Sequence, residues 1–234
     1  QRVRMKLSPI YNFCACIVAL LIMLTSCTSE DGVGNGYLQV ERVVAHQTAN
    51  VVVTRAVDND FYICVTNSQG QKVKEFAPGD EAAKQKVELA VGEYTLEAYT
   101  ANAQTPYAAD DKGQPKYHQT QKFTIRAAHV TTVDCQVPMT NCVWELKELE
   151  GAGTWVKDYT FTVAIGSRSF AMKVGDVVCF DPGEAQYRLT LKNADDEEFT
   201  QSGTLQAEAN KHYQVRYTVA PQQQPTVRIT PKND

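Results

Sequence analysis

Apolar and polar residues alternate with a period of two over most of the chain after residue 36. The alternation is clearest in residues 123–125, 161–165, 187–191, 213–219 and 227–229. Successive side chains of a strand point to opposite faces of its sheet, so this period is typical of half-buried antiparallel strands. The segments are short and are separated by Gly, Pro, Asn and Asp turns, which favours β-sandwiches. The pattern therefore predicts an all-β protein, in which residues 80–86 form one helical turn at most.

A weak internal repeat predicts the number of domains. Three segments of the first half have counterparts of the same pattern in the second half: 60–66 with 158–164, 91–99 with 182–191, and 129–137 with 212–219. We therefore predict two sandwich domains, residues 36–138 and 139–234, with 225–230 as the final strand. The junction between them has no run of flexible residues, so the two domains are expected to abut.

The first 26 residues have the features of an export signal. Translation is expected to start at Met5, Lys6 supplies a positive charge, and residues 13–24 form an apolar run. A helix of that length is too short to span a bilayer, which is typical of a signal peptide. The run ends in Leu24-Thr-Ser-Cys27, which resembles the lipobox where bacterial signal peptidase II cuts before a lipidated cysteine. The alternative is an ordinary signal peptide with an incidental cysteine.

A lipid on Cys27 would attach the mature chain to a membrane. One acyl chain anchors only reversibly, but a lipoprotein carries two or three, so we expect a permanent anchor. The tether, residues 27–35, is polar and rich in glycine. Its Glu30-Asp31 pair resembles the signal that sends Bacteroidota lipoproteins to the outer face of the outer membrane, which implies a surface-exposed protein.

Composition and charge exclude several classes of function. Lys and Arg number 23 and Asp and Glu number 27, and residues 1–26 carry three of the basic residues and none of the acidic ones. The mature chain therefore has 20 basic against 27 acidic residues and no basic cluster, which disfavours nucleic acid as a partner. The four histidines have no second ligand at metal spacing, and the acidic run 195–198 lacks the alternation of a calcium loop. We expect neither an enzyme nor a metal or other cofactor.

Besides the lipidated residue, four cysteines remain in the mature chain: Cys64, Cys135, Cys142 and Cys179. An even number in an exported chain permits disulfides, with one bridge in each domain as a possible arrangement. The alternative is four buried free thiols that act as small apolar side chains. Cys135 favours that alternative, because it alternates with Val133 and Val137 as a core residue does.

The longest irregular segment, residues 101–121, is a candidate binding region. Binding residues gather on loops that a rigid scaffold holds, and exposed tyrosines suit contacts with sugars or proteins. Tyr107 and Tyr117 are therefore candidate ligand-binding residues, as is Trp155 after the Gly-Ala-Gly-Thr run. The alternative is a solvated connection whose aromatic rings fold back onto the sandwich.

The order of these motifs resembles a family of Bacteroidota surface lipoproteins of unknown function that is related in architecture to the fimbrillins. The lipobox is followed by residues 36–40 (GYLQV), 54–56 (TRA), 61–65 (FYICV), 92–94 (GEY) and the cysteine-containing stretch 133–144. The Gly-Glu-Tyr strand is similar to one in transthyretin-like and carboxypeptidase-regulatory sandwiches. The resemblance implies two tandem immunoglobulin-like or transthyretin-like antiparallel β-sandwiches.

Two functions remain open. The first is a non-enzymatic binding or adhesion module at the outer-membrane surface, which presents loops to a glycan or a protein. The second, implied by the resemblance to fimbrillins, is a fimbrial subunit or anchor assembled by strand donation after arginine-specific cleavage at Arg55. The tail 222–234 offers only Val227 and Ile229 as alternating apolar residues, and prolines bracket them, so it is a poor donor strand. We therefore favour the binding module and expect a monomer.

Overall fold

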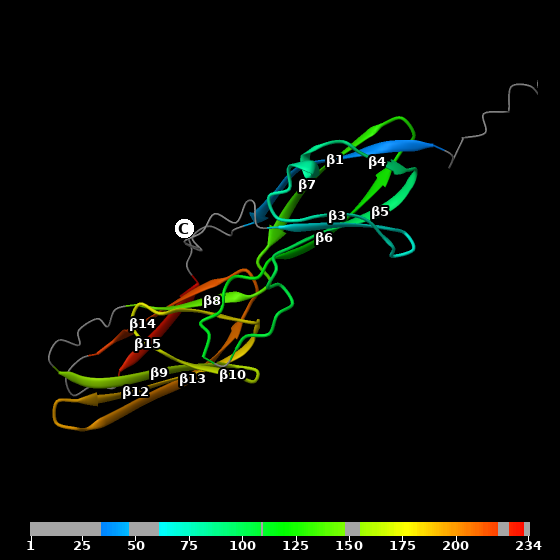
Figure 1. Cartoon of the computed structure of the whole chain (residues 1–234). Coiled ribbons are helices and arrows are strands. Elements are labelled where there is room, and N and C mark those ends of the chain that lie inside the picture. Colours follow the sequence, from blue (N-terminus) through cyan, green and yellow to red (C-terminus); the bar gives the residue numbers. More distant parts are fainter. Residues whose placement is uncertain (1–33, 47–60, 109, 148–154, 220–224, 232–234) are drawn as a thin grey trace, which may run out of the picture.

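The computed structural model describes residues 34–46, 61–108, 110–147, 155–219 and 225–231. These residues form strands and one short 3-10 helix, so the prediction of an all-β protein is confirmed. In the described ranges, no helix has the length and apolar character that a membrane span requires. Figure 1 shows two elongated sandwiches that lie end to end and are joined where β7 leads into β8.

The N-terminal sandwich is built from the strands β1 (Asn35–His46), β2 (Tyr62–Asn67), β3 (Lys72–Phe76), β4 (Val87–Ala90), β5 (Gly92–Tyr99), β6 (His118–Ile125) and β7 (Val130–Pro138), with the helix η1 (Glu81–Lys84) between β3 and β4. One of its sheets has the order β4-β1-β7 and the other has the order β3-β2-β5-β6. The alternating burial along these strands places one face of each sheet in a common core, which includes Leu38, Val65, Leu96 and Ile125.

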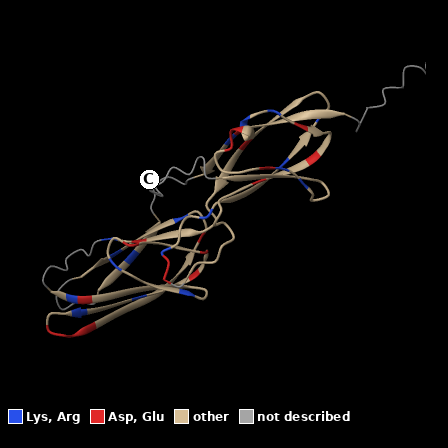
Figure 2. Ribbon diagram, in the orientation of Figure 1, with Lys and Arg blue, Asp and Glu red and all other residues tan. Residues whose placement is uncertain are grey.

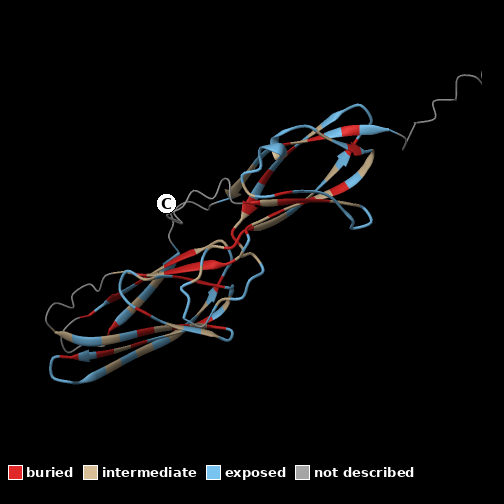
Figure 3. Cartoon of the chain, viewed as in Figure 1, coloured by how far each residue is buried: buried red, intermediate tan, exposed pale blue. Residues whose placement is uncertain are grey.

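The C-terminal sandwich is built from the strands β8 (Cys142–Leu146), β9 (Val156–Ile165), β10 (Arg168–Met172), β11 (Val177–Phe180), β12 (Gly183–Asn193), β13 (Glu198–Ala207), β14 (His212–Thr218) and β15 (Thr226–Pro231). Its sheets have the orders β11-β8-β14-β15 and β10-β9-β12-β13. Trp144, Phe161, Leu189 and Val215 are fully buried in its core. Figure 3 shows buried residues along the inner faces of both sandwiches and at the joint between them.

The two sandwiches repeat one topology. The sheet β4-β1-β7 corresponds to β11-β8-β14, and β3-β2-β5-β6 corresponds to β10-β9-β12-β13, so each strand of the first has its counterpart seven strands later. The three repeated sequence segments fall on β2 and β9, β5 and β12, and β7 and β14, which are equivalent positions. The second sandwich adds β15, which covers the expected final strand.

One pair of strands in each sandwich departs from the antiparallel pattern. The first and last strands of the repeat lie side by side and run parallel: β1 pairs with β7, and β8 pairs with β14. Alternation of buried and exposed residues does not distinguish this case, because a strand buried on one face has period two in either direction. All the other strand pairs in the described ranges are antiparallel.

Candidate functional site

The segment between β5 and β6 packs against the C-terminal sandwich. We call its residues 101–108 and 110–116 the strap. The backbone N–H of Cys179 donates to the carbonyl of Lys112 at 2.7 Å, so the strap lies along the edge of β11. The Lys112 ammonium contacts the carboxylate of Asp176 at 2.7 Å, and Arg168 donates to the carbonyl of Ala108 at 3.1 Å. The predicted loop thus binds the second sandwich instead of extending freely into solvent.

Asn141, in the short connection between β7 and β8, is the centre of this joint and is fully buried. Its Nδ2 donates to the Tyr107 hydroxyl at 2.6 Å and to the Gln114 carbonyl at 3.0 Å. Its Oδ1 accepts from the backbone N–H of Lys116 at 3.0 Å. One side chain therefore fixes three points of the strap relative to the start of the C-terminal sandwich.

Tyr107 is held between charged groups. The Lys116 ammonium lies 4.0 Å from the centroid of its ring, and the Arg168 guanidinium lies 4.3 Å from it. The same ammonium pairs with Asp181 at 3.2 Å. Burial raises the pKa of Tyr107 well above its ordinary value, so the phenol stays neutral and donates or accepts hydrogen bonds only. Tyr107 thus supports the strap, and its ring is already in contact with two cations.

A cleft of about 980 Å³ opens between the strap and the C-terminal sandwich. Its walls are residues 106–108 of the strap, the β9–β10 turn at 165–169, the β11–β12 turn at 181–184, and Gln186. These walls combine polar groups, namely hydroxyls, an amide, two carboxylates and a guanidinium, with apolar surface from proline, alanine and isoleucine side chains. The Arg168 guanidinium supports the wall from behind: its terminal nitrogens donate to the carbonyls of Ala108 and Asp111, and its Nε is buried.

The mixed lining determines what this cleft can bind. Cavities for apolar small molecules are lined mainly by hydrophobic side chains, with few polar groups. Here the carboxylates of Asp181 and Glu184 and the amide of Gln186 offer hydrogen bonds beside the apolar parts of the wall. In the described part of the chain, no three His, Cys, Asp or Glu side chains gather as a metal site would require. The arrangement suits a ligand rich in hydroxyl groups.

The structure corrects the prediction for Tyr117. This residue is 1% exposed and belongs to the N-terminal core, where its ring meets that of Phe61 edge to face at 6.0 Å. Its backbone forms an isolated antiparallel bridge with Met139, which draws the end of the loop into the sandwich. The alternative that the loop's aromatic ring folds back onto the sandwich therefore holds at Tyr117.

Trp155 lies away from the cleft. It is half-buried just before β9, and its ring packs against that of Phe199 with a centroid distance of 5.4 Å. The structure therefore brings only Tyr107 of the three aromatic candidates to the walls of the cleft. Residues 1–26, the lipidation candidate Cys27 and the processing candidate Arg55 lie outside the described residues.

Cys64, Cys135, Cys142 and Cys179 are buried and form no disulfides in the structure. Burial raises the pKa of both Cys142 and Cys179 to about 12, so these thiols stay protonated at neutral pH. The acidic run 195–198 forms the β12–β13 hairpin turn, at the opposite end of β12 from the cleft. Figure 2 shows charged residues of both signs distributed over the two sandwiches.

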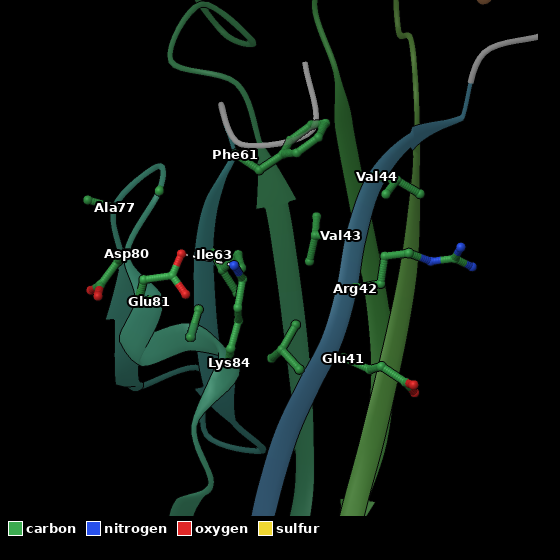
Figure 4. A pocket seen from close by; sticks show the side chains of 13 residues that line it. Glu41, Arg42, Val43, Val44, Phe61, Ile63, Ala77, Asp80, Glu81 and Lys84 are labelled. Carbon is green, nitrogen blue, oxygen red and sulfur yellow. Dashed lines mark hydrogen bonds and ion pairs between the residues drawn. The ribbon is translucent and has the colours of Figure 1, made fainter. Parts of the chain in front are cut away.

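A second, smaller cavity of about 190 Å³ lies beside β1 in the N-terminal sandwich. β4 pairs with β1 only from Asn35 to Leu38, and beyond that point η1 and the preceding loop face β1 across the cavity. Figure 4 shows Val43, Phe61 and Ile63 along it. Apolar and charged side chains share the walls of this cavity, which lies next to β1.

Sequence reasoning missed the residues that build the joint, above all Asn141 and Arg168. Asn141 follows Thr140 in a short connection between two apolar segments, and a polar side chain between two buried strands is a signal for a buried hydrogen-bond network. Arg168 gives no comparable signal, because an arginine that follows a turn is usually solvated.

A family model described as "Domain of unknown function (DUF4493)" matches residues 34–234. No curated protein sequence matches the chain. Among solved structures, the chain is similar to a candidate cell adhesion protein from Bacteroides uniformis, at 10% identity and a TM-score of 0.48, with 86% of this chain and 99% of that chain covered. It is also similar to a fimbrial assembly protein from Parabacteroides distasonis, at 7% identity and a TM-score of 0.45, with 85% and 98% covered.

Proposed function

We propose that this chain, which belongs to the DUF4493 family of domains of unknown function, is a surface lipoprotein that acts as a non-enzymatic binding or adhesion module. The observation that carries the proposal is the cleft of about 980 Å³ between the strap and the C-terminal sandwich, with carboxylate and amide groups on its rim. A site with fixed walls binds a ligand without first ordering its own loops, which lowers the entropic cost of binding.

A glycan is the ligand class that this cleft fits best. Sugar hydroxyls both donate and accept hydrogen bonds, and they match carboxylates, amides and guanidinium groups. Glu184 and Gln186 are exposed on the rim, and the Asp181 carboxylate lies on the same wall. A protein segment is the alternative ligand, and the binding experiment below distinguishes the two.

The location follows from the sequence motifs. The lipobox ending at Cys27 supports a lipid anchor, and the Glu30-Asp31 pair supports export to the outer face of the outer membrane. The N-terminal sandwich, the part of the fold that follows the tether, would then stand between the membrane and the cleft. In this arrangement the binding site faces away from the cell.

The proposal is tested by binding of the purified mature chain to an array of immobilised bacterial and host polysaccharides. Glu184→Ala and Gln186→Ala remove exposed groups from the cleft and should each weaken binding by about fivefold to tenfold. Asp195→Ala removes an exposed carboxylate at the far end of β12 and should leave binding unchanged. Binding to protein-coated surfaces with the same sensitivity to these variants would identify a protein ligand, and equal effects of all three would refute the site.

A fimbrial subunit or anchor is the second candidate, and one observation favours it. β1 is the first strand, and it lies between β4 and β7 in its sheet, so cleavage at Arg55 would allow it to leave and open a groove for a partner's strand. The tail weighs against it, because β15 already pairs with β14 of its own sandwich. An SDS-resistant ladder that forms with an arginine-specific protease, and is lost in Arg55→Ala, would establish strand donation.

A further inference from the structure

Strand β13 is the longest edge strand of the C-terminal sandwich. Within the described ranges, all its strand pairing is with β12, from Glu198 opposite Lys192 to Ala207 opposite Gly183. In Figure 1 it forms the lower margin of the sandwich, and no labelled strand lies beyond it. The N–H and C=O groups on its outer edge are therefore a template for another strand.

The other edge strands carry protective features that β13 lacks. β3 has Lys72 and Lys74, and β15 has Arg228 and ends at Pro231, and both lysine and proline discourage edge pairing. The strap covers the edge of β11, and β4 and β10 have only four and five residues. The ten residues of β13 contain neither proline nor a basic side chain.

The repeat makes this contrast sharper. β6 is the counterpart of β13 in the N-terminal sandwich, and it packs closely against β7. The hydroxyl of Thr131 on β7 donates to the carbonyl of Thr124 on β6 at 2.9 Å. The corresponding strands β13 and β14 have no such close packing among the described residues. β15 reaches β13 through one side chain, because the Val227 N–H donates to the Gln201 amide oxygen at 2.8 Å, but no strand pairing in the described ranges uses the outer backbone groups of β13.

The exposed side chains of β13 are complementary to themselves when two copies run antiparallel. If Ser202 lies on a two-fold axis, it faces Ser202 of the second copy. Thr200 then faces Thr204, and Glu198 faces Gln206. No like charges oppose each other in this register, and cross-strand threonine pairs are favourable.

The half-buried side chains on the other face of β13 also match. In the same register Phe199 faces Leu205 of the second copy, and Gln201 faces Gly203. Phe199 already packs against Trp155, so Leu205 of the second copy would extend an existing apolar contact. An aromatic side chain opposite an aliphatic one across two strands is stabilising.

We propose that β13 pairs with β13 of a second copy of this chain about a two-fold axis at Ser202, which joins the two four-stranded sheets into one. The expectation of a monomer rested on the weakness of the tail as a donor, but edge pairing requires no donor segment. Because the surface is the same on both chains, the assembly closes at a dimer. The proposal does not depend on the ligand of the cleft.

Sedimentation equilibrium of the full mature chain, with Cys27→Ser to prevent lipid attachment, should give twice the mass of one chain. Ser202→Lys and Ser202→Glu each place like charges on the axis and should raise the dissociation constant about fivefold to tenfold. An equal mixture of the two variants should recover a tight heterodimer, because opposite charges then meet.

Thr120→Lys places the same charge on an exposed position of β6, the counterpart of β13 in the N-terminal sandwich, and should leave the dimer intact. Ser202 is also exposed, so both substitutions should keep the circular dichroism of the folded chain. A single-chain mass at every concentration would overturn the proposal. A dimer that neither Ser202 variant weakens would overturn it as well, because the dimer would then use another surface.

Discussion

Replacement of Asn141 by alanine is expected to loosen the joint between the two sandwiches. The side chain is fully buried, and it makes three hydrogen bonds: to the Tyr107 hydroxyl, to the Gln114 carbonyl and from the Lys116 amide. Alanine removes all three at once while keeping the backbone unchanged. The strap then loses its central attachment to the connection between β7 and β8.

The magnitude follows from the number of bonds and their burial. A hydrogen bond within a protein contributes about 1 kcal/mol net, so loss of three lowers the free energy of unfolding by about 3 kcal/mol. Asn102→Ala is the matched control, because Asn102 makes one hydrogen bond in the same strap, from Nδ2 to the Pro115 carbonyl at 3.1 Å. It should cost about 1 kcal/mol.

Urea unfolding measured by two probes tests this prediction. Both tryptophans lie in the C-terminal sandwich, so their fluorescence reports on that half alone, whereas far-UV circular dichroism reports on both halves. The two curves should coincide for the wild type and separate for Asn141→Ala, because the sandwiches then unfold independently. A loss below about 0.5 kcal/mol with coincident curves would refute the role of Asn141.

Three further predictions concern other parts of the molecule. Gly113 has φ +76°, and an added Cβ would lie 2.6 Å from the Tyr107 ring. Gly113→Ala should therefore lower the free energy of unfolding in urea by about 3 kcal/mol. Gly70→Ala is the control and should lower it by about 1 kcal/mol, because φ there is +75° but the space around the Cβ is open. Burial raises the pKa of Asp176, but the hydrogen bonds from Lys112 and from the Lys173 backbone, together with the charges of both lysines, outweigh it, and the pKa lies below the ordinary 3.8. A lowered pKa of this carboxyl stabilises the folded chain above pH 3.8, so its contribution to the free energy of unfolding should fade as the pH falls below that value. Urea unfolding at a series of pH values should show this loss in the wild type and not in Asp176→Asn. Cys27→Ala should abolish palmitate labelling and release the chain from membranes, and persistence in the outer-membrane fraction would contradict the lipobox.

Much of the fold could be predicted because burial on one face of a strand imposes a period of two on its residues. In β12 the alternation of Ala185, Leu189 and Leu191 with exposed residues is enough to identify the strand and its inner face. The internal repeat also predicted that β5 and β12 occupy corresponding positions in the two sandwiches. The parallel pairing of β1 with β7 could not be predicted, because strand direction leaves no mark on the pattern.

The candidate site was harder to predict because its residues meet only in three dimensions. Tyr107 and Tyr117 lie in one irregular segment, where no period tells which ring enters the core. Two contacts determine where the rings lie: the bridge from Tyr117 to Met139 and the hydrogen bond from Asn141 to Tyr107. Each contact joins residues more than twenty positions apart in the sequence. Local sequence therefore located the segment but did not distinguish the supporting ring from the buried one.

The parallel pairing of β1 with β7 has a mechanical consequence. β1 begins at the outer end of the N-terminal sandwich, and β7 ends at the joint, with Tyr37 beside Val130 and His46 beside Pro138. A pull that draws residue 35 away from the joint acts along both strands in opposite directions. The hydrogen bonds of the pair are then sheared together instead of being opened one after another from an end. The sandwich nearest the tether is therefore built to resist tension along its long axis, and β8 and β14 repeat that geometry in the sandwich beyond it.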